Sequence, residues 1–138
     1  KKMCRENKFL KAAIRKIDSA NSDYSVQHRH AAIIVKSGRV LSSGVNRIKT
    51  HPDAVVEADD GEIICKSIHA EMDAILKVKN KDQLKGATMY IARKGRLDQI
   101  GLSLPCSMCQ RNLAKYGFRK AVFTTEHDHG VIYFGEEE

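Results

Sequence analysis

The order of predicted elements indicates an α/β fold in which one sheet is covered by helices on both faces. Apolar residues recur at helical spacing in two segments, and a third segment lies between a proline and a glycine as helices often do. Five other segments have the length and pattern of strands. Turns containing Gly, Asn or Asp and two longer irregular segments separate them. The order helix, hairpin, helix, strand, helix, strand, strand therefore predicts a three-layer α/β/α domain around a five-stranded sheet.

The first half of the chain begins with a helix and a hairpin. Helical periodicity predicts a helix over residues 5–20, which ends at a run of Asn, Ser and Asp. Residues 30–35 and 39–45 flank a Lys-Ser-Gly turn, as two strands of a hairpin do. The first strand is apolar almost throughout, so we expect both of its faces to be covered.

The middle of the chain combines two irregular segments with a helix and a strand. Residues 46–66 show little periodicity and form a candidate binding loop. Ser67 is a suitable cap for a helix over residues 68–79. A strand is predicted over residues 87–92, and a second loop, rich in Arg, Lys and Gly, over residues 93–104.

The last third of the chain contains a helix and two strands. Pro105 is expected to open the helix over residues 106–116, and Gly117 to close it. Strands are predicted over residues 119–125 and 131–134. The segment between them is too short for a crossover helix, so we expect the last two strands of this mixed sheet to form an antiparallel hairpin.

Length and composition fit one cytoplasmic globular domain. The 138 residues are enough for a single core, with 30% charged and 42% hydrophobic residues. No apolar run approaches the roughly 18 residues that span a bilayer, so we expect no membrane association. Residues 1–14 lack the apolar stretch of a signal peptide, and four cysteines without an export signal indicate reduced thiols in a cytoplasmic setting.

The formal charge of +7 permits an interaction with nucleic acid, because phosphate contacts supply most non-specific affinity. The same charge also suits a protein that is merely soluble or that binds an anionic nucleotide. Basic residues are spread along the whole chain rather than gathered in one block. Charge alone therefore does not decide between a polynucleotide and a small ligand.

Two short motifs carry the residues that indicate chemistry: His69-Ala70-Glu71 and Pro105-Cys106-Ser107-Met108-Cys109. Alone, the Cys-x-x-Cys spacing fits a redox dithiol, half of a structural zinc site, or two buried thiols. The isolated Cys4 and Cys65 do not provide the second close pair that a four-cysteine zinc site needs. The position of the pair, late in the chain and after proline, does not favour a thioredoxin-like motif.

The placement of both motifs at predicted helix starts favours a catalytic metal site. Thiolates in the first turn of a helix are stabilised by free backbone N–H groups and the helix dipole. His69, in the first turn of its own predicted helix, could be the third ligand, leaving one tetrahedral position of zinc for water. Glu71 is rotated from His69 by about 200° on a helix, and near the helix terminus it can still reach that water from the side.

Together the two motifs resemble the His-x-Glu and Pro-Cys-x-x-Cys pattern of the zinc-dependent cytidine/deoxycytidylate deaminase superfamily. The predicted elements follow the order of that family over nearly the whole chain. The resemblance implies a cytidine deaminase-like fold and one catalytic Zn²⁺ held by His69, Cys106 and Cys109. It also implies that Glu71 moves protons in a hydrolytic deamination. Cytidine deaminases usually have cysteine at the position of His69, which is a departure here.

The resemblance also suggests substrate contacts and assembly. Asn46, which follows the second predicted strand, is similar to a substrate-binding asparagine, and an amide suits a sugar hydroxyl or a base edge. Ala70 is expected to offer its backbone N–H to the base. Relatives commonly associate, so we expect a homo-oligomer.

The resemblance leaves the substrate open between classes. A terminal hairpin is typical of the cytidine-type division, so the leading hypothesis is conversion of cytosine to uracil in a nucleoside or nucleotide. The first alternative is a deaminase acting on cytosine or adenosine in single-stranded DNA or tRNA, bound by basic residues of the two loops. These residues are Arg47, Lys49, Arg93, Lys94 and Arg96. The second alternative is a zinc-stabilised nucleic-acid-binding module without catalysis.

Overall fold

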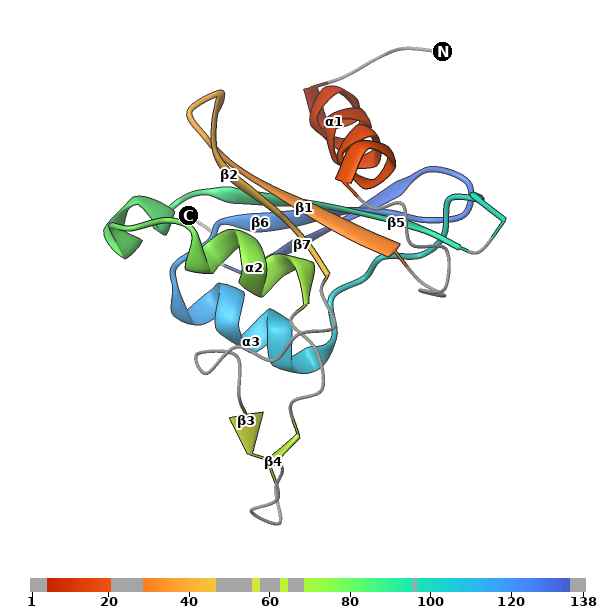
Figure 1. Ribbon diagram of the computed structural model, residues 1–138. Helices are drawn as coiled ribbons and strands as arrows, with labels where there is room; N and C mark the ends of the chain where they lie inside the picture. Colours follow the sequence, from red (N-terminus) through yellow and green to blue (C-terminus); the bar gives the residue numbers. More distant parts are fainter. Residues whose placement is uncertain are drawn as a thin grey trace.

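The computed structural model describes residues 5–20, 29–46, 56–57, 63–64, 69–95 and 97–134. Five strands of the described chain form one sheet in the order β2-β1-β5-β6-β7 (Figure 1). Their bounds are Arg29–Lys36 for β1, Arg39–Val45 for β2, Thr88–Lys94 for β5, Lys120–Thr124 for β6 and His129–Tyr133 for β7. The predicted five-stranded sheet is confirmed.

The sheet is mixed, as predicted. Strand β1 pairs antiparallel with both β2 and β5, and β5 pairs parallel with β6. The β1–β2 turn uses Ser37 and Gly38, which have φ angles of 54° and 78°, the left-handed conformation that tight hairpins need. Strands β6 and β7 pair antiparallel, which confirms the terminal hairpin. Its turn is closed by the N–H of Asp128, which donates to Thr125 Oγ1 over 2.8 Å.

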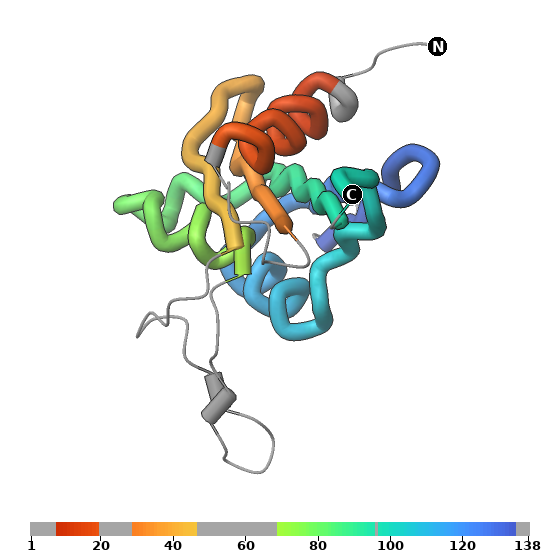
Figure 2. The backbone as a smooth tube through the Cα atoms, turned by 45° about the vertical axis from the view of Figure 1, so that its right-hand side comes forward, coloured from red at the N-terminus to blue at the C-terminus, as the bar shows by residue number. Residues whose placement is uncertain are grey.

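Helices cover both faces of the sheet, which confirms the three layers (Figures 1 and 2). Helix α1 (Arg5–Ala20) lies on one face, and α2 (Ala70–Leu76) and α3 (Ser107–Lys115) lie on the other. Side chains that alternate along β1 divide between two cores: Ala31, Ile33 and Val35 pack with α1. Ala32 and Ile34 instead belong to the cluster that includes residues of α2 and α3.

Helix α2 is shorter than the predicted helix over residues 68–79. His69 is its N-cap, with extended backbone angles of −70° and 152°, and Lys77 is its C-cap. The predicted cap, Ser67, lies outside the described residues. The helix ends early because the N–H groups of Lys77 and Val78 bond to carbonyls three residues back, which tightens the last turn.

Helix α3 begins two residues later than Pro105. Cys106 is the N-cap and Pro105 precedes it, so the proline is not the first helical residue that the sequence predicted. The predicted stop is confirmed: Gly117 has a φ of 86° and follows the C-cap. The N–H groups of Phe118 and Gly117 donate to the carbonyls of Leu113 and Ala114, which is a Schellman motif.

The remaining described elements are short and lie between β2 and β5 in the sequence. Within residues 46–66 the short strands β3 (Val56–Glu57) and β4 (Ile63–Ile64) pair antiparallel. A short 3₁₀ helix, η2 (Lys81–Leu84), leads into β5. No helix in the described part of the chain is long and apolar enough to cross a membrane.

Candidate metal centre and pocket

Two helix starts place three metal-binding side chains together. His69 is the N-cap of α2, Cys106 is the N-cap of α3, and Cys109 lies in the first turn of α3. His69 Nδ1 lies 3.3 Å from Cys109 Sγ and 4.0 Å from Cys106 Sγ. The three ligand atoms all lie within 4.8 Å of one another, so these residues could hold one metal ion.

The distances fit tetrahedral zinc. Zinc–sulfur bonds of about 2.3 Å and zinc–nitrogen bonds of about 2.05 Å at a tetrahedral angle require a nitrogen–sulfur distance of about 3.6 Å. The two distances from the His69 nitrogen fall on either side of this value. One imidazole and two thiolates are also a donor set that zinc prefers, and three protein ligands leave one position open.

The electrostatics of the cluster also favour a bound cation. Burial raises the pKa of the Cys109 thiol, and the neighbouring Glu71 carboxylate and Cys106 thiol raise it further. A thiolate here is therefore unfavourable without a compensating positive charge. The sulfur of the neighbouring Cys106 already has a donor at the helix start, because the N–H of Cys109 donates to Cys106 Sγ over 3.5 Å.

Glu71 is a buried carboxyl group beside this cluster. It is the second residue of α2 and only 6% exposed. Burial raises the pKa of Glu71 above its ordinary value of 4.5, although a backbone hydrogen bond and His69 act in the opposite direction. The 200° rotation expected between His69 and Glu71 does not apply, because His69 is extended and not helical. Both residues line the same pocket.

The pocket has a volume of about 290 Å³ and joins the metal cluster to the end of the sheet. This volume is near the lower limit for small-molecule sites, so it suits a single nucleoside-sized ligand. The lining residues come from β1, the end of β2, the start of α2 and the segment before α3. They are His30, Asn46, His69, Ala70, Glu71, Ser103, Leu104, Pro105 and Cys106.

The two predicted substrate contacts both lie in this pocket. Asn46 follows β2, and its Oδ1 accepts the N–H of His30 over 2.9 Å. The N–H of Asn46 also donates to the His30 carbonyl over 3.3 Å. Ala70 is the first residue of α2 and is 1% exposed. The backbone N–H of a first helical residue has no partner within its helix, so it suits a ligand.

Gly44 is a supporting residue that the sequence did not reveal. A Cβ at this position would lie 2.5 Å from the backbone nitrogen of Ala74 and 2.7 Å from the carbonyl oxygen of Ala70. Helix α2 therefore rests directly on the backbone of β2, which positions His69 and Glu71. No local pattern marks this glycine, because the contact depends on the three-dimensional packing.

Ser103 is a second residue that the sequence did not reveal. It is buried and belongs to the segment that leads to Pro105 and Cys106. Ser103 Oγ lies 2.9 Å from the carbonyl oxygen of Ile91 and accepts the N–H of Thr124 over 2.8 Å. The N–H of Ser103 donates to the Thr124 carbonyl over 2.9 Å. These bonds attach the segment before the cysteines to β5 and β6.

The basic residues predicted to rim the pocket are not among its lining residues where they are described. Lys94 forms an ion pair of 2.7 Å with Asp18 of α1, so it lies on the opposite face of the sheet from the metal cluster. Arg93 donates to the carbonyl oxygen of Leu102 over 3.0 Å. Arg47, Lys49 and Arg96 lie outside the described residues.

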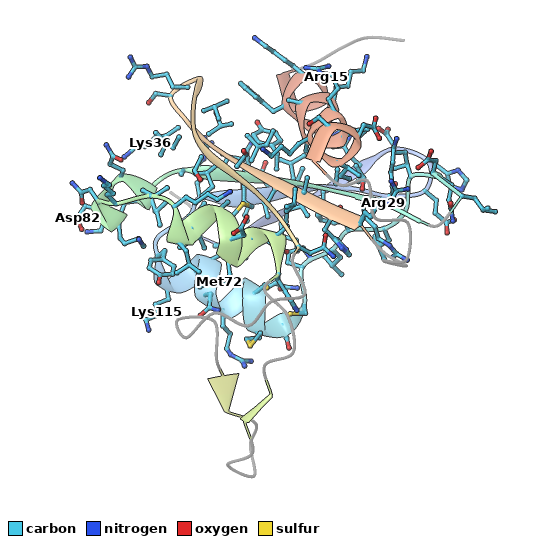
Figure 3. All side chains as sticks on the ribbon, viewed as in Figure 1. Arg15, Arg29, Lys36, Met72, Asp82 and Lys115 are labelled. Atoms are coloured by element: carbon cyan, nitrogen blue, oxygen red, sulfur yellow. The ribbon has the colours of Figure 1, made fainter. Side chains whose placement is uncertain are left out.

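A buried arginine holds the loop after β5. Arg29, at the start of β1, is 2% exposed and donates to the Gly95 carbonyl over 3.0 Å (Figure 3). It also forms an ion pair with the exposed Asp98. The hydrogen bond from Arg29 lowers the pKa of Asp98, and the positive charges of Arg29 and Lys94 act in the same direction.

Comparisons with known proteins agree with this site. A model of the cytidine and deoxycytidylate deaminase zinc-binding region matches residues 3–125. No curated protein matches the chain significantly.

Solved structures show the same fold at low identity. dCMP deaminase from the cyanophage S-TIM5, in complex with dCMP and dUMP, is 24% identical with a TM-score of 0.57, covering 88% of this chain and 83% of that one. Cytidine deaminase from Burkholderia pseudomallei is 21% identical with a TM-score of 0.59, covering 96% and 94%. Cytidine deaminase from Mycobacterium leprae is 18% identical with a TM-score of 0.53, covering 94% of each chain.

The range matched by the family model includes both helix starts and all three candidate ligands. Because it spans most of the 138 residues, the chain belongs to the family defined by the cytidine and deoxycytidylate deaminase zinc-binding region.

Proposed function

We propose that this protein is a zinc-dependent hydrolytic deaminase that converts cytosine to uracil in a nucleoside or nucleotide and releases ammonia. The observation that carries the proposal is the buried Glu71 carboxyl, which lines one pocket with His69 and Cys106. A purely structural zinc site has four protein ligands and needs no buried acid beside it. The arrangement therefore favours catalysis over a zinc-stabilised binding module.

His69, Cys106 and Cys109 would hold the zinc ion, which when bound supplies Lewis-acid activation of a water molecule. Glu71 would accept the proton of that water on its carboxylate and deliver it to the ring nitrogen next to the reacting carbon. The same carboxylate would then take the proton of the hydroxyl group added to that carbon and pass it to the amine, so that the carbon–nitrogen bond breaks and ammonia leaves. Burial raises the pKa of the Glu71 carboxyl, which makes it a stronger proton acceptor than an exposed glutamate and so suits these transfers.

Three features support a small nucleoside or nucleotide rather than a polynucleotide. The pocket volume of about 290 Å³ fits one such molecule, and the described lining contains no Phe, Tyr or Trp on which successive bases could stack. The antiparallel β6–β7 pair also fits the cytidine-type division suggested by the sequence. Asn46 and the backbone N–H of Ala70 are the proposed substrate contacts.

The direct test is ammonia release from a panel containing cytidine, deoxycytidine, CMP, dCMP, adenosine and single-stranded oligonucleotides. We expect turnover of at least one cytosine nucleoside or nucleotide by the zinc-loaded protein. The matched control is Glu71→Gln, which should retain zinc and lose turnover. Activity confined to oligonucleotides would replace the substrate assignment, and an active Glu71→Gln variant would exclude the proposed proton carrier.

We further propose that the elements from α1 to β7 form one cytoplasmic catalytic domain that assembles as a homo-oligomer. Both core clusters contact the same sheet, which supports a single domain. Several large apolar side chains are exposed and could be covered by a second copy: Val40, Leu97, Leu102, Leu104 and Tyr133. Light scattering after size exclusion measures the assembly directly, and a monomeric mass would exclude it.

A further inference from the structure

A histidine of the sheet faces the same pocket as the metal ligands. His30 lines the pocket and is half-buried at the start of β1. Side chains alternate along a strand, so His30 points to the same side as Ala32 and Ile34, whose cluster includes residues of α2 and α3. The neighbouring strand places Arg93 directly opposite His30. The pocket therefore has a sheet wall as well as a metal wall.

The polar side chains of the described pocket lining divide into three groups. His69 and Cys106 belong to the metal cluster, and Glu71 is the proposed proton carrier. The Ser103 hydroxyl is engaged with Ile91 and Thr124 within the loop. The remaining polar side chains are His30 and Asn46, which are adjacent across β1 and β2 and are linked by two hydrogen bonds involving backbone groups.

The geometry of the cytosine ring assigns a role to this pair. The carbon that bears the amino group and the nitrogen that bears the sugar lie on opposite sides of the ring. When the reacting carbon is at the metal wall, the sugar therefore points away from His69 and Cys106. The polar side chains on the sheet wall are the imidazole of His30 and the amide of Asn46.

We propose that His30 is a specificity-determining residue that hydrogen-bonds a sugar hydroxyl of the substrate, so that the enzyme selects nucleosides over sugar-modified analogues. The inference rests on the proposed function. His30 is well suited to this contact because β1 lies inside the sheet between β2 and β5, so the backbone that carries the imidazole is held from both sides. The bond from the backbone N–H of His30 to Asn46 Oδ1 holds the Asn46 side chain beside the His30 backbone.

The test combines a protein change with a ligand change. The kcat and KM of wild type and His30→Ala are measured with cytidine and with 2′,3′-dideoxycytidine, which lacks both ring hydroxyls of the sugar. In wild type, we expect cytidine to be preferred. In His30→Ala, KM for cytidine should rise about three- to tenfold, while the value for dideoxycytidine stays unchanged. The preference should therefore shrink by the same factor.

Matched variants separate this role from a structural one. His30→Gln keeps a hydrogen-bonding group and should recover part of the preference. His129→Gln changes a histidine of β7 that pairs with Asp128 rather than lining the pocket, and it should leave both KM values unchanged. Zinc content and melting temperature are measured for each variant. If His30→Ala fails to fold, His30→Leu retains the side-chain volume without the ring nitrogens and takes its place.

Binding of the two reaction products makes the test of the inference independent of turnover. Calorimetry with uridine and 2′,3′-dideoxyuridine on the zinc-loaded protein should show the same loss of preference in His30→Ala. If no substrate is turned over, the proposed function fails while this binding measurement still tests His30. A preference that is equal in wild type and His30→Ala would overturn the inference. An effect seen with CMP but not with cytidine would also overturn it, because His30 would then contact the phosphate.

Discussion

Gly44→Ala tests whether the contact between β2 and α2 positions the site. The added Cβ would lie 2.5 Å from the Ala74 nitrogen, which is about 0.9 Å short of the 3.4 Å at which ordinary contact begins. Backbone atoms of a helix cannot move aside individually, so α2 must shift by a distance of that order. His69 and Glu71 would move with it.

The expected magnitude follows from this displacement. Overpacking in a core costs about 1–3 kcal/mol, which corresponds to a fall in melting temperature of roughly 3–12 °C for a domain of this size. A displacement of about 1 Å in a catalytic group lowers the rate by about 100-fold. We therefore expect activity to fall by more than the loss of folded protein can explain.

The assay is thermal unfolding together with kcat on the best substrate of the panel, both measured at saturating zinc. Ser43→Ala is the matched control, because it changes the adjacent β2 residue and adds no atoms to the α2 contact. A Gly44→Ala protein with wild-type melting temperature and wild-type kcat would refute the positioning role of this contact.

Three other perturbations have definite expected outcomes. A chelator should lower the melting temperature of the zinc-loaded protein. The free energy of unfolding should fall by about 4 kcal/mol if free zinc is 1,000 times Kd, and Cys109→Ser should remove most of that response. Ser103→Ala should cost about 1–3 kcal/mol in denaturant unfolding, because the buried N–H of Thr124 loses its acceptor; an unchanged midpoint would contradict this. Asp98→Asn should be less stable than wild type at neutral pH. Arg29 lowers the pKa of Asp98 in the folded state, so the difference in stability between wild type and variant should persist above about pH 3.8. It should close as the pH falls through the folded-state pKa. A stability difference independent of pH would contradict the ion pair.

The sequence predicted the layers and the metal cluster because both depend on local patterns. The apolar pattern of β1 already indicated a strand covered on both faces, and the structure buries it between α1 and α2. His69 and the two cysteines were recognisable as a ligand set from residue type and spacing alone. Their neighbourhood in space is confirmed by distances of 3.3 and 4.0 Å.

Helix boundaries and pocket walls were less predictable because they depend on tertiary contacts. The helical period continues past Leu76, yet the last turn tightens and the helix ends there. Lys94 was expected at the pocket, but β5 extends far enough that its side chain points to α1 and pairs with Asp18. The role of Gly44 and the orientation of His30 require the register of β1 and β2, which no single segment encodes.

The two helix caps that hold the ligands have a consequence for how the domain opens. His69 and Cys106 are 37 residues apart in sequence, so a shared ion would act as a reversible cross-link between α2 and α3. Neither helix could then fray at its first turn without releasing the ion. Amide protons in both helices should therefore exchange as one cooperative unit when zinc is bound, and as two separate units after it is removed.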